Sequence, residues 1–139
     1  MAIDRRRFLK SSAVGLAAAT AGCALPHLGA DAKPKGESAF RHGVASGDPL
    51  SDRVILWTRV SPEEDALGAS IAISWWVARD EAGLDIAGQG EATAVADRDY
   101  TIKIDVEGLV AGEAYYYGFR VDGTGDRSPT GRTRTLPPS

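Results

Sequence analysis

The residues that could do chemistry in this chain are few and scattered. Among 139 residues there are two histidines and one cysteine. A hydrolytic nucleophile needs a base beside a serine or cysteine. His42 stands between Arg41 and Gly43, and no serine lies in a Gly-x-Ser-x-Gly turn. We therefore interpret His42 as a surface or edge-strand side chain rather than a catalytic base.

Carboxylates that could hold a metal ion occur in two pairs, Asp48 with Asp52 and Asp97 with Asp99. A metal site needs several His, Cys, Asp or Glu side chains that converge, and neither pair has a histidine or third carboxylate beside it in sequence. Asp48 precedes Pro49, where the usual role of an aspartate is to shape the turn. We predict no catalytic, cofactor-binding or metal-ligating residue in this chain.

Phosphate-binding loops are not indicated either. The stretches 88–90 (GQG) and 123–125 (GTG) lack the third glycine and the following helix that such loops need. Arg127, Arg132 and Arg134 could meet an anion, but Arg132 and Arg134 share one strand face. We interpret that face as the wet side of an edge strand, where charge opposes aggregation.

The elements that must position these residues are strands, because apolar and polar residues alternate along most of the chain. In the stretch 99–107, Tyr100, Ile102, Ile104 and Val106 alternate with polar or charged residues, as in a sheet packed on one face. A second inward face is predicted for Tyr115, Tyr117, Phe119 and Val121, and one shared face for Ile71, Ile73, Trp75 and Val77. We expect strands over 41–46, 53–60, 70–78, 86–94, 99–107, 115–121 and 130–136.

About seven short strands without an amphipathic helix predict an all-β fold, an antiparallel sandwich of the immunoglobulin or fibronectin type III kind. Leu109 and Tyr115, with Gly112 between them, have the spacing of the tyrosine corner of fibronectin type III domains. We expect Ile55 and Trp57 to share an inward face, with Trp57 as the large core residue of the second strand. Trp57→Ala would then cost about 3–5 kcal/mol.

The N-terminus has the pattern of a twin-arginine export signal over residues 1–32. Arg5, Arg6, Arg7 and Lys10 form a basic head before the weakly apolar run 11–22. That run is shorter than the roughly 20 residues needed to cross a bilayer. We predict export through the twin-arginine translocase, to the periplasm or outside the cell, without a stable membrane span. Residues 33–39 follow as a polar linker.

The cleavage site has alternatives. Small residues before Ala30 and Ala32 both fit a signal peptidase, while Cys23 follows Ala21 and Gly22 as in a lipoprotein acceptor site. Thr20 stands where leucine is usual, so we favour cleavage near Ala30 over a lipid anchor on Cys23. Cleavage there leaves 12 basic and 18 acidic side chains. An acidic domain without a basic run excludes nucleic acid as an expected partner.

The stretch 40–60, FRHGVASGDPLSDRVILWTRV, resembles the opening of the mature alkaline phosphatase D (PhoD-like) family. The segments that carry the resemblance are His42–Pro49 and Ile55–Arg59, with Trp75–Val77, Tyr115–Tyr117 and Arg132–Leu136 also similar to that family's N-terminal domain. The likeness covers essentially the whole chain. It implies a fibronectin III-like N-terminal domain over 40–136.

The resemblance also implies a function that is carried out elsewhere. Members of this family are secreted phosphomonoesterases and phosphodiesterases with a calcium-dependent centre, in some cases containing iron, in a larger C-terminal metallophosphatase domain. Residues 137–139 would begin the linker to that domain, which is absent here, so this part alone would be inactive. We expect it to dock on that domain through an exposed patch around Val44–Asp48. The alternative is a free-standing exported β-sandwich that binds a partner near Trp76 and Tyr116.

Overall fold

The computed structural model describes residues 37–138. The predicted export signal with Cys23, and the predicted linker up to residue 36, lie outside the described residues. In the described part, two short 3-10 helices, η1 (Glu64–Ala66) and η2 (Ala96–Arg98), accompany seven strands. No helix in the range 37–138 is long and apolar enough to cross a membrane. The strands are β1 (Val44–Gly47), β2 (Arg53–Arg59), β3 (Ile71–Ala78), β4 (Ile86–Ala94), β5 (Thr101–Glu107), β6 (Ala114–Val121) and β7 (Gly131–Arg134).

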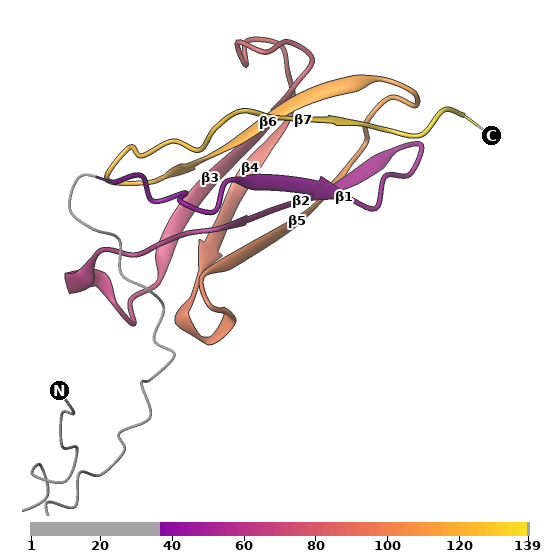
Figure 1. Ribbon diagram of the computed structural model, residues 1–139. Coiled ribbons are helices and arrows are strands. Elements are labelled where there is room, and N and C mark those ends of the chain that lie inside the picture. The colour runs from indigo at the N-terminus through magenta and orange to yellow at the C-terminus, as the bar shows by residue number, and fades with distance from the viewer. Residues whose placement is uncertain (1–36, 139) are drawn as a thin grey trace, which may run out of the picture.

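The strands form two antiparallel sheets that face each other (Figure 1). One sheet has three strands in the order β1-β2-β5, and the other has four in the order β4-β3-β6-β7. The chain passes between the sheets after β2, after β4 and after β5. The predicted all-β antiparallel sandwich of about seven strands is therefore confirmed.

The core lies between the two sheets and is built from alternate residues of the long strands. The inward faces predicted for β5 and β6 are confirmed, since every second residue there is buried or packs against the core. On β3, the face that Ile71, Ile73, Trp75 and Val77 share is the one that turns inward. This is the arrangement expected when each sheet buries one face and exposes the other to solvent. The core side chains include Phe40, Val54, Leu56, Val60, Ile73, Val77, Tyr100, Ile102, Val106, Tyr115, Tyr117 and Phe119.

The face predicted for β2 is wrong. Val54, Leu56 and Thr58 are buried, whereas Ile55 and Trp57 are only partly buried and lie on the outer face. Because β2 is apolar on both faces, its own alternation does not fix which face turns inward. The register decides: Val54 pairs with the buried Val106, and Trp57 pairs with Lys103 on the wet side of β5. Trp57 is thus not the core residue of the second strand.

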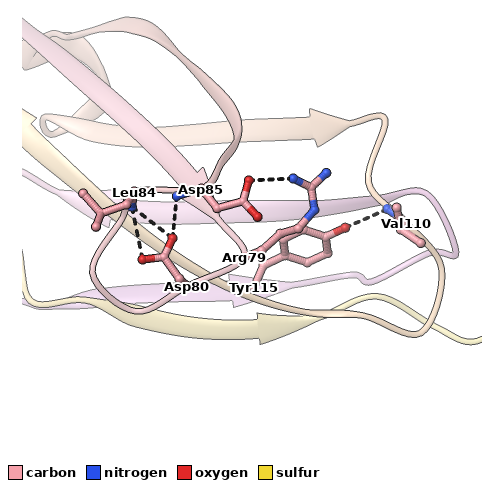
Figure 2. Close-up of polar contacts among 6 residues, drawn as sticks. All are labelled: Arg79, Asp80, Leu84, Asp85, Val110 and Tyr115. Atoms are coloured by element: carbon pink, nitrogen blue, oxygen red, sulfur yellow. Dashed lines mark hydrogen bonds and ion pairs between the residues drawn. The ribbon is translucent and has the colours of Figure 1, made fainter.

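The tyrosine corner predicted from Leu109 and Tyr115 is present at the crossover from β5 to β6. Tyr115 is fully buried, and the backbone N–H of Val110 donates to its hydroxyl oxygen at 2.8 Å (Figure 2). The Thr135 hydroxyl adds a bond to the Val110 carbonyl at 2.6 Å. Gly112 has φ +75°, which L side chains adopt at a cost, so the glycine suits the turn.

Three aromatic rings in the four-stranded sheet lie on glycines of the adjacent strand. Trp75 is paired with Gly90, Trp76 with Gly118, and Tyr117 with Gly131. A methyl group at Gly90 or Gly118 would lie 2.8 or 2.9 Å from the indole, and one at Gly131 would overlap the Tyr117 ring. Aromatic rings covering cross-strand glycines pin the register of a sheet. Trp75 and Tyr117 lie toward the core, and Trp76 lies on the outer face.

Candidate functional site

Two of the residues considered for chemistry, His42 and Asp99, are brought together by Arg59 at the end of β2. One terminal nitrogen of Arg59 lies 2.6 Å from His42 Nε2, and two other guanidinium nitrogens bind the Asp99 carboxylate at 2.8 and 2.9 Å. The hydrogen bond from Arg59 lowers the pKa of Asp99. Both groups are engaged by the guanidinium, so the cluster connects β2 to the turn before β5 and is not arranged for proton transfer.

The other acidic candidates lie apart. Asp48 is exposed in the turn after β1 and has φ +47°. Asp52 is exposed, and its Oδ1 lies 3.4 Å from Nε of Arg53. Asp97 is exposed in η2. Within residues 37–138, no group of three or more His, Cys, Asp or Glu side chains is placed to hold a metal ion. The described residues therefore do not fit a calcium or iron centre.

The glycine pairs lie in a strand and a turn, and two of the arginines near the C-terminus lie on an edge strand. The GQG stretch lies inside β4, and Gly123 and Gly125 have φ of +92° and +78° in the turn between β6 and β7. Arg132 and Arg134 are exposed on β7, an edge strand as predicted. The side chain of Arg134 donates to the carbonyl of Gly112 at 3.0 Å. Neither glycine pair forms a phosphate loop at a helix N-terminus.

The outer face of the four-stranded sheet carries an open groove of about 320 Å³. Trp76 contributes to its floor, lying flat on Gly118, and the cross-strand neighbour Gln89 and Arg120 lie beside it. The predicted binding face near Trp76 thus has a concave surface. Sequence reasoning missed Gln89 and Arg120, which only the strand registers of β4 and β6 bring next to the indole.

One wall of this groove is the loop between β3 and β4. Hydrogen bonds and an ion pair within the loop fix its conformation. Asp80 accepts hydrogen bonds from the backbone N–H groups of Leu84 and Asp85, and Arg79 pairs with the Asp85 carboxylate at 3.0 Å (Figure 2). These backbone donors lower the pKa of Asp80. Gly83 at the loop tip approaches the Trp76 ring. The groove can hold a polar ligand against an aromatic surface.

Comparisons with known proteins agree on one relationship. The sequence profile of the family described as "PhoD-like phosphatase, N-terminal domain" matches residues 22–137. "Alkaline phosphatase D" of Bacillus subtilis (strain 168) is 36% identical over 144 residues, which cover 96% of this chain and 24% of that protein. A solved structure, "Structure of PhoD", superposes with a TM-score of 0.67 at 36% identity and covers 77% of this chain and 21% of that one. The chain spans about a quarter of these relatives' length.

Proposed function

Because the chain belongs to the family of PhoD-like phosphatase N-terminal domains, we propose that it serves as the non-catalytic front domain of an exported phosphatase. The longer enzyme would hydrolyse phosphate monoesters or diesters, and this domain would pack against its metallophosphatase domain. The observation that carries the proposal is the combination of 36% identity over nearly the whole chain with coverage of 24% of alkaline phosphatase D.

The structural part of this proposal is that the sandwich is fibronectin type III-like. The sheet order β1-β2-β5 against β4-β3-β6-β7 supports it, as does the corner made by Tyr115 and Val110. For export, the support is the Arg5–Arg7 pattern and its weakly apolar run, which favour the twin-arginine translocase and a periplasmic or extracellular location.

The metal of the reaction would be bound outside this chain. The family resemblance implies calcium, in some members with iron, and residues 37–138 bring no three candidate ligands together. No step of the hydrolysis is therefore assigned to a residue here. The domain's contribution would be to fold, to position its neighbour and to limit access to it.

Assays of two proteins test this proposal. With added calcium, the longer gene product should hydrolyse p-nitrophenyl phosphate or bis-p-nitrophenyl phosphate, whereas the purified 139-residue chain should not. Leu56→Asp, which places a charge in the core, is the control for contamination, because turnover that belongs to the chain would disappear with its fold. Turnover by the 139-residue chain that Leu56→Asp abolishes would contradict the proposal.

A second candidate function is supported by the groove over Trp76. A free-standing exported binding module would use that indole, Gln89 and Arg120 to hold a partner. Reading the gene beyond codon 139 separates the two candidates. An open frame that encodes a metallophosphatase supports the first, and a stop codon followed by unrelated sequence supports the second. The mass of the secreted product reports the cleavage site as well.

A further inference from the structure

Three exposed large apolar side chains of the described part lie on neighbouring segments at one end of the sandwich. Leu50, Val110 and Leu136 are exposed to 52%, 52% and 47%. They come from three different segments: the loop after β1, the loop between β5 and β6, and the segment after β7. We call these three side chains the C-terminal apolar patch. Of the other three, Leu84 and Ile86 lie in or next to the loop between β3 and β4, which the pairing of Ala78 with Tyr116 places at the same end. Leu67 follows η1 at the opposite end.

Hydrogen bonds hold the three segments together, so the patch is a fixed surface. The N–H of Leu136 donates to the Leu50 carbonyl at 3.0 Å, and the N–H of Gly112 donates to the Leu136 carbonyl at 2.8 Å. The Thr135 hydroxyl donates to the Val110 carbonyl at 2.6 Å, and Thr135 itself is buried. These bonds keep the three segments side by side, while their apolar side chains stay exposed.

The chain leaves the sandwich through this patch. Figure 1 shows the C-terminus at the same end as the loop between β1 and β2, with the indigo start of the described chain at the opposite end. Leu136 belongs to the patch and is followed by Pro137 and Pro138. Proline restricts the backbone, and a pair of prolines extends only about 3 Å per residue. Whatever follows residue 138 therefore begins within reach of the patch.

We propose that the C-terminal apolar patch is the docking surface for the polypeptide that follows residue 138 in the longer protein. The inference rests on the proposed function, because it takes that polypeptide to be the phosphatase domain. The matched family is an N-terminal domain, and the relative is about four times as long as the part matched. Exposed apolar side chains fixed beside the exit of the chain are covered at low entropic cost by a domain tethered there.

This surface differs from the one expected at Val44–Asp48. In that segment Val44 is partly buried, and the exposed residues after it are Ala45, Ser46, Gly47 and Asp48. These small and polar residues offer little apolar area for an interface. The patch begins two residues further on, at Leu50, and gains its other members from segments distant in sequence.

Cysteine accessibility in the longer protein tests the proposal. Leu50→Cys and Val110→Cys report on the patch, and Leu67→Cys, at a position 48% exposed after η1 at the opposite end of the sandwich, is the matched control. Each maleimide labelling rate is divided by the rate of the same variant in urea, and peptide masses locate the label. Because the exposed fractions of the three positions are similar, they should label at nearly equal rates without docking. Docking should slow the two patch positions about tenfold or more.

The outcomes separate the docking surface from the enzyme's function. Labelling of Leu50→Cys and Val110→Cys at rates close to that of Leu67→Cys would overturn the docking proposal. Protection that is lost on dilution would assign the patch to a second copy of the chain and would overturn it as well. Hydrolysis of p-nitrophenyl phosphate by the same protein reports on the proposed function separately, so active enzyme with an unprotected patch rejects the docking surface alone.

Discussion

The two sheets of this domain hold their strands in register by different means. In the four-stranded sheet, rings such as Tyr117 lie directly on glycines such as Gly131, with no room for another carbon atom. In the three-stranded sheet, charges meet across β2 and β5, for example Arg53 with Glu107 at 2.7 Å. Close packing tolerates little change in volume, whereas an ion pair in water contributes little. The first sheet should therefore be sensitive to single methyl groups, and the second should be tolerant.

The largest expected effect is from one methyl group on the four-stranded sheet. Gly131→Ala places a Cβ where the Tyr117 ring lies, and Tyr117 is buried and cannot swing into solvent. We expect a loss of about 3 kcal/mol in the free energy of unfolding, measured by urea denaturation. Gly47→Ala in β1 is the matched control, because a Cβ at Gly47 would have no atom within 4 Å. Equal losses in the two variants would remove the contrast between the sheets.

The connection between the two sheets should come next. Tyr115→Phe keeps the ring but removes the hydroxyl that accepts from the Val110 N–H. A buried donor left without a partner costs about 1–3 kcal/mol, so we expect a loss of about 2 kcal/mol. Tyr116→Phe, on the partly buried outer face one residue later, is the control and should change stability little. Thermal unfolding of both variants measures the difference, and an unchanged midpoint for Tyr115→Phe would show that the corner is dispensable.

A smaller effect is expected at Trp57 on the three-stranded sheet. Its indole lies on the outer face opposite Lys103 and is only partly buried, so Trp57→Ala should cost about 1 kcal/mol rather than the 3–5 kcal/mol of a core tryptophan. Leu56→Ala, its fully buried neighbour, should cost about 3 kcal/mol and serves as the internal reference. If Trp57→Ala were the more damaging of the two in urea unfolding, the assignment of the faces of β2 would have to be reversed.

The error at Trp57 shows how far the sequence predicts the fold. Clear alternation between apolar and charged residues in 99–107 fixed both the strand and its inward face. The run 53–60 predicted a strand correctly, but its apolar residues occur on both faces, and only pairing with β5 chooses between them. The spacing of Leu109 and Tyr115 predicted the corner because a local hydrogen bond produces it.

The surfaces were less predictable than the core, since they are assembled from segments distant in sequence. Nothing in the sequence near Leu50 indicates that Val110 and Leu136 lie beside it, because hydrogen bonds between separate loops bring them together. The groove was partly anticipated through Trp76, but its neighbours Gln89 and Arg120 depend on the registers of β4 and β6. Sequence patterns report which face of one strand is apolar, and they do not report which loops meet.

The smallest effect should come from the ion pair between Arg59 and Asp99, and it should depend on pH. The folded pKa of Asp99 lies below its usual value of 3.8, because Arg59 donates hydrogen bonds to the carboxylate. The contribution is therefore fully present above that value and is lost as the pH falls through the lower folded pKa. Since the Asp99 side chain is 63% exposed, the pair should contribute about 0.5 kcal/mol or less.

Asp99→Asn tests this sign, because asparagine tolerates the left-handed backbone at φ +52° and removes only the charge. At pH 7 the variant should unfold at slightly lower urea than the parent, and the gap should close as the pH falls below 3.8. Asp97→Asn removes the same charge two residues away in the exposed η2 and is the control. A gap that widens toward acid pH, or one equally large for Asp97→Asn, would show that the bond between Arg59 and Asp99 does not stabilise the three-stranded sheet. Together with a large loss in Gly131→Ala, a closing gap would establish that steric fit fixes the strand register of the four-stranded sheet. The charged contacts of the three-stranded sheet would then be weak and dependent on pH.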